Sequence, residues 1–181
     1  MNRAFKISSL FLIHFLIIFC GVQSASDLIQ DTCKKIAATE VEVNFNFCVQ
    51  SLGSDPHSHE VDLGGLGLIA VKLLQANITG TIEYTKQLLK QKLDPRLLKR
   101  LSFCWRLYAP FEGKDVIPFY KAKDYSSVAG FAGVFGDNEV LCDSQLTQKK
   151  GMVPPLTKRN AEIFQLSAIV VDIMHFLGWR A

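Results

Sequence analysis

The sequence predicts an all-α protein, built as an antiparallel up-down four-helix bundle with an N-terminal α-helical hairpin and two disulfides. Apolar residues recur at three- and four-residue steps through its long segments, which is the period of a helix that buries one side. Asp-Pro pairs break the chain between segments, and no stretch alternates apolar and polar residues around hairpin turns, as strands do. Long helices joined by short connections favour a bundle in which neighbours run in opposite directions.

The N-terminus has the organisation of a secretory signal peptide. Arg3 and Lys6 form a short positive region, an apolar core follows over residues 10–20, and small residues precede the first acidic side chain. This core is much shorter than the roughly 20 residues that a membrane-spanning helix needs. We therefore expect residues 1–25 to be removed and residues 26–181 to form one secreted, extracellular domain.

Removal of the signal peptide changes the charge of the chain. The full sequence has 20 basic and 17 acidic residues, and the loss of Arg3 and Lys6 leaves 18 against 17, a net charge of +1 with histidine neutral. This balance gives no reason to expect a nucleic-acid partner. We find no later apolar run long enough to span a bilayer, so we expect no membrane segment in the mature form.

Removal of the signal peptide also lowers the number of cysteines, because Cys20 lies within it. Four cysteines then remain: Cys33, Cys48, Cys104 and Cys142. An even number in an oxidising compartment indicates two disulfides. Four cysteines allow three connectivities, and the sequence alone does not choose among them. We favour the pairs that are neighbours along the chain, Cys33–Cys48 and Cys104–Cys142.

The first half of the mature chain is expected to hold the hairpin and one long helix. Residues 27–40 and 45–52 form the two short helices of the hairpin, which a disulfide between them would clamp together. Asp55-Pro56 then breaks the chain. A long helix comes next, over residues 62–91, where apolar residues form a continuous stripe.

The second half begins with a helix start at Asp94-Pro95, where Asp caps and Pro suits the first turn. Pro110, Gly113 and Pro118 disturb the later part of this segment, because a regular helix cannot pass a proline without a kink or break. The bundle is therefore expected to be irregular in this region.

Two further helices complete the predicted bundle. Residues 124–142 are the weaker candidate, because three glycines lower their helix propensity. The last helix has the clearest apolar stripe in the sequence. We expect Thr157 to cap it and Gly178 to end it.

Motifs for catalysis and for cofactors are weak in this sequence. No nucleophile elbow, zincin motif or paired-carboxylate segment indicates an enzyme, so no residue is given a catalytic role. Gly65-Leu66-Gly67 fits part of a dinucleotide-binding pattern, but that site needs a preceding strand and a parallel sheet. Small residues at a close helix contact are the better interpretation, and we expect no cofactor.

One short segment concentrates potential metal ligands: Asp55, His57, His59 and Glu60. Their side chains offer suitable atoms, but they crowd a single turn, with no matching ligand pair elsewhere. A solvated loop is the better interpretation, and we expect no metal site.

A run of basic residues crosses the junction of two predicted helices: Lys90, Lys92, Arg96, Lys99, Arg100 and Arg106. Such a run is usually a solvated face, but it can also bind an acidic polymer or the acidic cleft of a partner. A separate motif, Asn77-Ile78-Thr79, is a glycosylation sequon. The signal peptide makes Asn77 accessible to the glycosylation machinery, whereas its place near an apolar stripe counts against use.

The cysteine layout and the order of segments together resemble a known family. The resemblance is carried by DTCKKIAATEVEVNFNFCVQSL, the Asp-Pro break before a long helix, LSFCWRLY, AKDYSSV, EVLCDSQL and TKRNAEIFQLSAIVVDIMHFLG. These segments resemble the plant invertase and pectin methylesterase inhibitors over nearly the whole mature chain. SDLIQ, KKGMVPPLTK and KDY are most similar to the plane-pollen type of invertase inhibitor.

The resemblance implies a four-helix bundle with an N-terminal hairpin and disulfides between the first two and the last two mature cysteines. It implies an apoplastic inhibitor without catalytic residues, whose partner is a cell-wall enzyme, either acid invertase (β-fructofuranosidase) or pectin methylesterase. Inhibitors of invertase can use a Pro-Lys-Phe triplet, and the matching positions here are Lys123, Asp124 and Tyr125. The alternative is a non-inhibitory bundle that binds cell-wall polysaccharide. The oligomeric state is left open.

Overall fold

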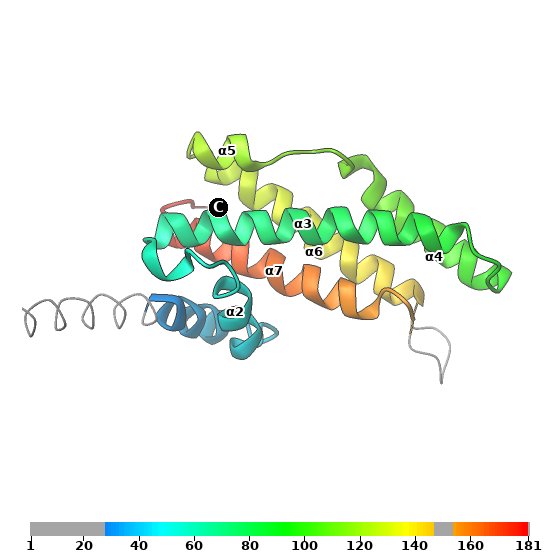
Figure 1. The fold of residues 1–181 in the computed structure, drawn as a ribbon, viewed down its shortest axis with the longest axis horizontal. Helices are drawn as coiled ribbons and strands as arrows, with labels where there is room; N and C mark the ends of the chain where they lie inside the picture. The colour runs from blue at the N-terminus through cyan, green and yellow to red at the C-terminus, as the bar shows by residue number, and fades with distance from the viewer. Residues whose placement is uncertain (1–27, 147–153, 181) are drawn as a thin grey trace, which may run out of the picture.

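The computed structural model describes residues 28–146 and 154–180, and the predicted signal peptide lies outside them. Within these ranges all regular secondary structure is helical, which confirms the predicted all-α class. Figure 1 shows long helices packed side by side, with a small hairpin of helices beside the bundle.

Four antiparallel helices form the bundle: α3 (Leu63–Leu89), α4 (Pro95–Tyr108), α6 (Tyr125–Leu146) and α7 (Thr157–Phe176). Packing joins α3 to α4, α4 to α6, α6 to α7 and α7 back to α3, so the helices close a square around one core. Residues of the apolar stripes predicted from the sequence line this core, as the fully buried Leu66, Ile163 and Ile173 illustrate. The up-down bundle is therefore confirmed.

The N-terminal hairpin consists of a helical segment over residues 28–39 and α2 (Phe45–Leu52). The disulfide Cys33–Cys48 joins its two helices, with the Cα atoms 5.7 Å apart. Both cysteines are fully buried, as are Ile36 and Leu52 beside them. The hairpin thus has a small core of its own.

Two side-chain contacts attach this hairpin to α7. The Asn44 backbone N–H donates to Oε1 of Gln165 at 2.9 Å, and the Thr39 hydroxyl donates to Oδ2 of Asp172 at 3.2 Å. Asn44 also caps α2, since its side chain accepts from the Phe47 N–H at 3.0 Å. The same turn therefore starts α2 and fixes the hairpin to the bundle.

The second disulfide, Cys104–Cys142, joins α4 to α6, with the Cα atoms 4.9 Å apart. Both sequence-favoured pairings are thus present. Because this link closes a long loop, it restricts the unfolded chain strongly. It also holds α4 and α6 together close to the C-terminal end of α4.

The proline-rich connection between α4 and α6 is irregular, as expected from the sequence. A short 3-10 turn, Ala109–Phe111, ends the α4 arm, and the small helix α5 (Ile117–Lys121) comes after a loop. Lys86 on α3 forms an ion pair with Glu112 in this loop. In Figure 1 the connection runs along α3, so that α5 lies at the end of the bundle opposite the α3–α4 turn.

The ends of the helices agree only in part with the sequence prediction. Asp94 caps α4 as expected, accepting from the N–H groups of Arg96 and Leu97 at 2.9 and 3.3 Å. Thr157 does not cap α7, and this prediction was wrong: the cap residue is Leu156, and the buried Thr157 hydroxyl has no hydrogen-bond partner within the described residues. Gly178, with φ 105°, ends α7 as predicted.

The α6 helix is stronger than its glycine content suggested. It runs without interruption to Leu146, four residues past the predicted end at 142. Packing against both α4 and α7 stabilises it, and Phe135 and Cys142 on its inner side are fully buried. Tertiary burial therefore outweighs the weak local propensity.

The α3 helix is long and apolar enough, by length and composition, to cross a membrane, contrary to the expectation that no later segment reaches that length. Half of its most apolar window is buried within the bundle, which accounts for this composition. Near its start, Gly67 lies where an added Cβ would be 2.4 Å from the Tyr120 hydroxyl oxygen and 3.1 Å from Cγ2 of Ile173. The glycine motif is thus a close helix contact, as interpreted.

Candidate functional site

The Lys123–Tyr125 segment connects α5 to α6 at one end of the bundle. The Lys123 N–H donates to the Tyr120 carbonyl at 2.9 Å, and the Asp124 N–H donates to the Phe119 carbonyl at 3.0 Å. These two bonds form a Schellman motif, which normally requires a left-handed residue, most often glycine. Lys123 fills that position with φ 60°, and it is the only non-glycine residue in the described ranges with positive φ.

Asp124 has a structural role of its own. Its carboxylate caps the first turn of α6, with Oδ1 accepting from the Ser127 N–H at 3.1 Å and Oδ2 accepting from the Ser127 hydroxyl at 2.7 Å. The Ser127 hydroxyl, followed by the Ser127 N–H, lowers the pKa of the Asp124 carboxyl below its usual range. The carboxylate is exposed, but each of its two oxygens accepts a hydrogen bond that serves the helix start.

Tyr125 begins α6 and is half-buried. Its ring centroid lies 5.6 Å from that of Tyr120, at an interplanar angle of 56°. Tyr120 is buried, and its hydroxyl donates to the Gly64 carbonyl on α3. One part of Tyr125 therefore covers the core, and the other faces solvent.

An apolar groove lies next to these three residues, with a volume of about 250 Å³. Its lining comes from the irregular connection and the start of α6: Pro110, Phe111, Lys114, Asp115, Val116, Phe119, Ser127 and Phe131. Phe119 is 48% exposed, so part of its ring is accessible in the groove. Because Ser127 both lines the groove and bonds Asp124, the groove and the Lys123–Tyr125 segment are adjacent.

Irregular structure was expected here from the sequence, but the groove itself was missed. Its signal was present as aromatic residues placed between the helix-breaking Pro110 and Pro118 and directly after them. In this segment Phe119 is exposed and Phe111 is partly buried, whereas Tyr120 is buried. Phe111 nevertheless packs edge-on against Phe135, with ring centroids 4.5 Å apart, and so provides a fixed floor.

The segment with potential metal ligands, residues 55–60, forms a turn held by its own side chains. Oδ1 of Asp55 accepts from the His57 N–H at 2.8 Å, and the His57 ring lies 3.8 Å from the Glu60 carboxylate. Within the described residues, no group of three or more His, Cys, Asp or Glu side chains is placed to hold a metal ion. His59 instead lines a pocket of about 230 Å³.

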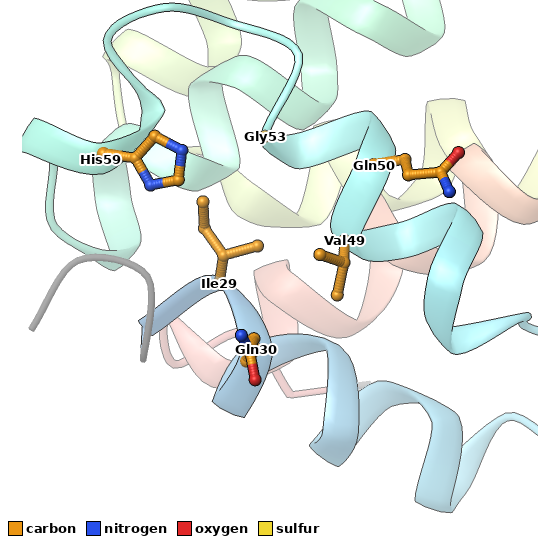
Figure 2. Close-up of a pocket in the computed structure, with 6 residues that line it drawn as sticks. All are labelled: Ile29, Gln30, Val49, Gln50, Gly53 and His59. Carbon is orange, nitrogen blue, oxygen red and sulfur yellow. The ribbon is translucent and has the colours of Figure 1, made fainter. Parts of the chain in front are cut away.

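Figure 2 shows this pocket between the hairpin and the turn that comes after it. Ile29 and Val49, one from each helix of the hairpin, point into it, with the His59 ring on the other side. Its apolar floor belongs to the core of the hairpin, since Ile29 is almost fully buried. Gln30 and Gln50 also line it, so the pocket is a gap between packed elements with both apolar and polar side chains on its walls.

Asn77 of the sequon lies within the uninterrupted α3 helix and is half-buried. Its Nδ2 atom, which would carry a glycan, donates to the Leu73 carbonyl at 3.2 Å. The Thr79 hydroxyl is bonded to the Gln75 carbonyl at 2.9 Å. A glycan would take one of the two hydrogens on Nδ2, and use of the sequon stays a prediction.

Comparison with known proteins gives a consistent result. Residues 27–173 match the family model described as plant invertase/pectin methylesterase inhibitor. Proteins of Platanus acerifolia and Platanus orientalis, both named "Putative invertase inhibitor", are 39% identical to this chain over 171 and 156 residues. These alignments cover 93% and 85% of this chain and 95% and 92% of the relatives. A pectinesterase inhibitor of Actinidia deliciosa is 28% identical, over 87% of this chain and 83% of that protein.

Proposed function

Because the chain belongs to the plant invertase/pectin methylesterase inhibitor family, we propose that it is secreted and inhibits a plant cell-wall enzyme by covering its active-site opening. The observation that carries this proposal is the match over residues 27–173, together with relatives that are named as inhibitors. Acid invertase is the first target to test, since the Platanus relatives share 39% of their residues with this chain. Pectin methylesterase is the second, supported by the 28% identical pectinesterase inhibitor.

The architecture supports inhibition by rigid docking. Two disulfides and the contacts from the hairpin to α7 restrict the bundle before it meets a partner. A surface that is already ordered loses little conformational entropy on binding, which favours tight complexes. The protein then needs no chemistry of its own, because excluding substrate from the target is sufficient.

We assign the docking surface to Lys123, Asp124 and Tyr125 with the adjacent groove at Phe119. A partly exposed aromatic side chain whose inner side is held by packing is a favourable anchor at an interface. The Tyr125 ring packs against the ring of Tyr120 in this way. Lys123 and Asp124 add one charge of each sign at the rim, where they would orient the partner.

The experiment is a titration of acid invertase and of pectin methylesterase with the chain purified after export from a secretory host, at acidic pH. We expect saturable inhibition of at least one enzyme. Full activity of both enzymes at micromolar protein would refute the proposal. Protein sequencing of the exported N-terminus tests removal of residues 1–25, and the mass before and after glycosidase treatment tests Asn77.

The docking surface is tested with a matched pair of variants. Tyr125→Leu keeps an apolar side chain against Tyr120 but removes the ring, and we expect it to weaken inhibition about tenfold or more. Val140→Ala truncates a side chain that is 52% exposed farther along α6, and it should leave inhibition unchanged. Equal inhibition by both variants, with unchanged unfolding curves, would move the docking surface elsewhere.

A further inference from the structure

A basic groove lies along α4, and its lining is separate from that of the apolar groove at Phe119. It has a volume of about 340 Å³ and is lined by Arg96, Lys99, Arg100, Phe103, Arg106 and Gln145. The first five residues belong to α4 and Gln145 belongs to α6. The structure thus gathers most of the basic run of the sequence into one hollow surface, which we call the α4 basic groove.

The charge of this groove is one-sided. Pro95–Tyr108 contains four basic residues, all in the groove, and no acidic residue. Asp94 at its N-terminus caps α4 through the N–H groups of Arg96 and Leu97. After residue 25 the chain has 18 basic and 17 acidic residues, so outside the four groove residues 14 basic stand against 17 acidic. The positive potential is therefore local to α4 and not a property of the whole surface.

The groove is elongated, because its residues lie on successive turns of one helix. Arg96, Arg100, Phe103 and Arg106 are spaced by three or four positions. At 1.5 Å per residue, the ten positions from Arg96 to Arg106 extend about 15 Å. A line of cations over this length suits a linear polyanion with regularly repeated charges better than a single small anion.

Phe103 gives the groove an apolar centre. The ring is half-buried, and the Arg106 guanidinium carbon lies 5.9 Å from its centroid. The apolar face of a sugar ring can cover an aromatic ring of this kind, while guanidinium groups bind carboxylates through paired N–H donors. A polymer of sugars that each carry a carboxylate satisfies both features.

We propose that the α4 basic groove binds polyuronate chains, such as the de-esterified galacturonan of pectin. This choice of anion rests on the cell-wall location in the proposed function, but the binding is separate from inhibition. Gln145 and Tyr125 lie 20 positions apart on α6, about 30 Å along that helix. The Gln145 end of the groove and the Lys123–Tyr125 segment thus lie toward opposite ends of the bundle (Figure 1), whereas Arg106 lies four positions before Pro110 of the apolar groove at Phe119. An inhibitor held in this way would stay in the wall with its docking surface free.

The test measures binding of the exported chain to polygalacturonate, to fully methyl-esterified pectin and to poly-glutamate. We expect binding to polygalacturonate that weakens as salt is raised, and little binding to the esterified polymer, whose backbone is the same but uncharged. Binding to both pectins alike would overturn the proposal. Stronger binding to poly-glutamate would also overturn it, because the groove would then fit an acidic protein surface.

Matched charge variants locate the site. Arg96→Gln/Arg100→Gln should weaken polygalacturonate binding about fivefold or more, as expected for the loss of two charge contacts at the surface. Lys35→Gln/Lys72→Gln removes the same charge from exposed positions on the hairpin and α3, and it should bind like the unchanged chain. Equal losses in both double variants would show a nonspecific charge effect and refute the groove.

The inhibition assay separates this proposal from the proposed function. Arg96→Gln/Arg100→Gln should inhibit the target enzyme as the unchanged chain does. If neither enzyme is inhibited by any form, polygalacturonate binding that depends on Arg96 and Arg100 would still support the groove. Inhibition that falls together with polymer binding would mean that α4 contacts the target, and the separate polymer site would be rejected.

Discussion

The Tyr108 hydroxyl donates to Oδ1 of Asn160 at 3.1 Å inside the bundle, joining α4 to α7. Nδ2 of Asn160 in turn lies 3.3 Å from Sγ of Cys142, within the Cys104–Cys142 disulfide. Tyr108 is 1% exposed and Asn160 is fully buried. Three helices thus meet at one buried polar point, where each polar atom depends on its partner.

Tyr108→Phe tests this polar point. The change keeps the ring but leaves the buried oxygen of Asn160 without its donor, so we expect a loss of about 1–3 kcal/mol in the free energy of unfolding. Chemical denaturation with the disulfides intact measures it. Tyr84→Phe on the outer part of α3 is the control and should stay within about 0.5 kcal/mol. An equal loss in the free energy of unfolding for Tyr108→Phe and Tyr84→Phe would mean that the hydrogen bond to Asn160 adds no stability of its own.

Gly67→Ala tests the close contact of α3 with α5 and α7. The new Cβ would lie 2.4 Å from the Tyr120 hydroxyl oxygen, which is held by its bond to the Gly64 carbonyl. We expect a loss of about 1–3 kcal/mol from overpacking. Gly130→Ala is the control, since no heavy atom lies within 4 Å of its added Cβ. It should stabilise the protein by up to about 1 kcal/mol through helix propensity, as thermal unfolding would show.

These residues illustrate how much of the fold could be predicted from the sequence. The helix order could be predicted from local apolar periodicity, and the disulfide pairs from the distance between cysteines along the chain. The Asp94 cap could be predicted from the Asp-Pro pair at the helix start. The continuous α6 helix was underestimated, because burial against α4 and α7 depends on residues far along the chain. The Tyr108–Asn160 bond could not be foreseen, because a buried tyrosine and asparagine 52 positions apart leave no local signal.

The candidate site was predictable only in outline. The resemblance led to Lys123, Asp124 and Tyr125, and the structure places them in one turn. The sequence did not indicate that Lys123 is left-handed or that Asp124 caps α6, since both depend on where α5 ends. The groove at Phe119 was missed, because a proline predicts a break but not the shape of the surface after it.

Stability should depend on pH through Glu139, which is 7% exposed. Burial, followed by the charges of Asp143 and Glu42, raises its pKa from 4.5 to about 7. The folded state therefore holds this proton more tightly than the unfolded state. The stabilisation is complete below pH 4.5 and falls as the pH rises toward 7, by about 1–3 kcal/mol.

Denaturation of Glu139→Gln at several pH values tests this dependence. The variant should lose much of the decline between pH 4.5 and 7, because glutamine does not ionise. Burial, followed by the charge of Glu40, also raises the pKa of Asp172, so some decline of the same sign should remain. Asp137→Asn, at an exposed position on α6, is the control and should keep the full decline. An unchanged slope in Glu139→Gln would contradict the assignment.

Lys123→Gly separates the structural role of the Lys123 backbone from any role of its side chain. Glycine adopts φ 60° without the cost that an L-residue bears, so the Schellman motif should persist. The free energy of unfolding should rise by up to about 1 kcal/mol or stay unchanged, because glycine also adds entropy to the unfolded chain. Lys123→Val, which is β-branched, should destabilise the protein in the same denaturation assay.

Lys123→Gly also tests recognition, because it should leave the fold intact. If the Lys123 ammonium orients a target enzyme, Lys123→Gly should inhibit more weakly by roughly two- to fivefold, as expected for one charge at a rim. Lys121→Gln removes a neighbouring exposed charge from the end of α5 and serves as the control. A more stable Lys123→Gly that inhibits with full strength would show that the lysine is not used by the target. The docking contact would then have to come from Tyr125 and the groove at Phe119, whose geometry the substitution leaves in place.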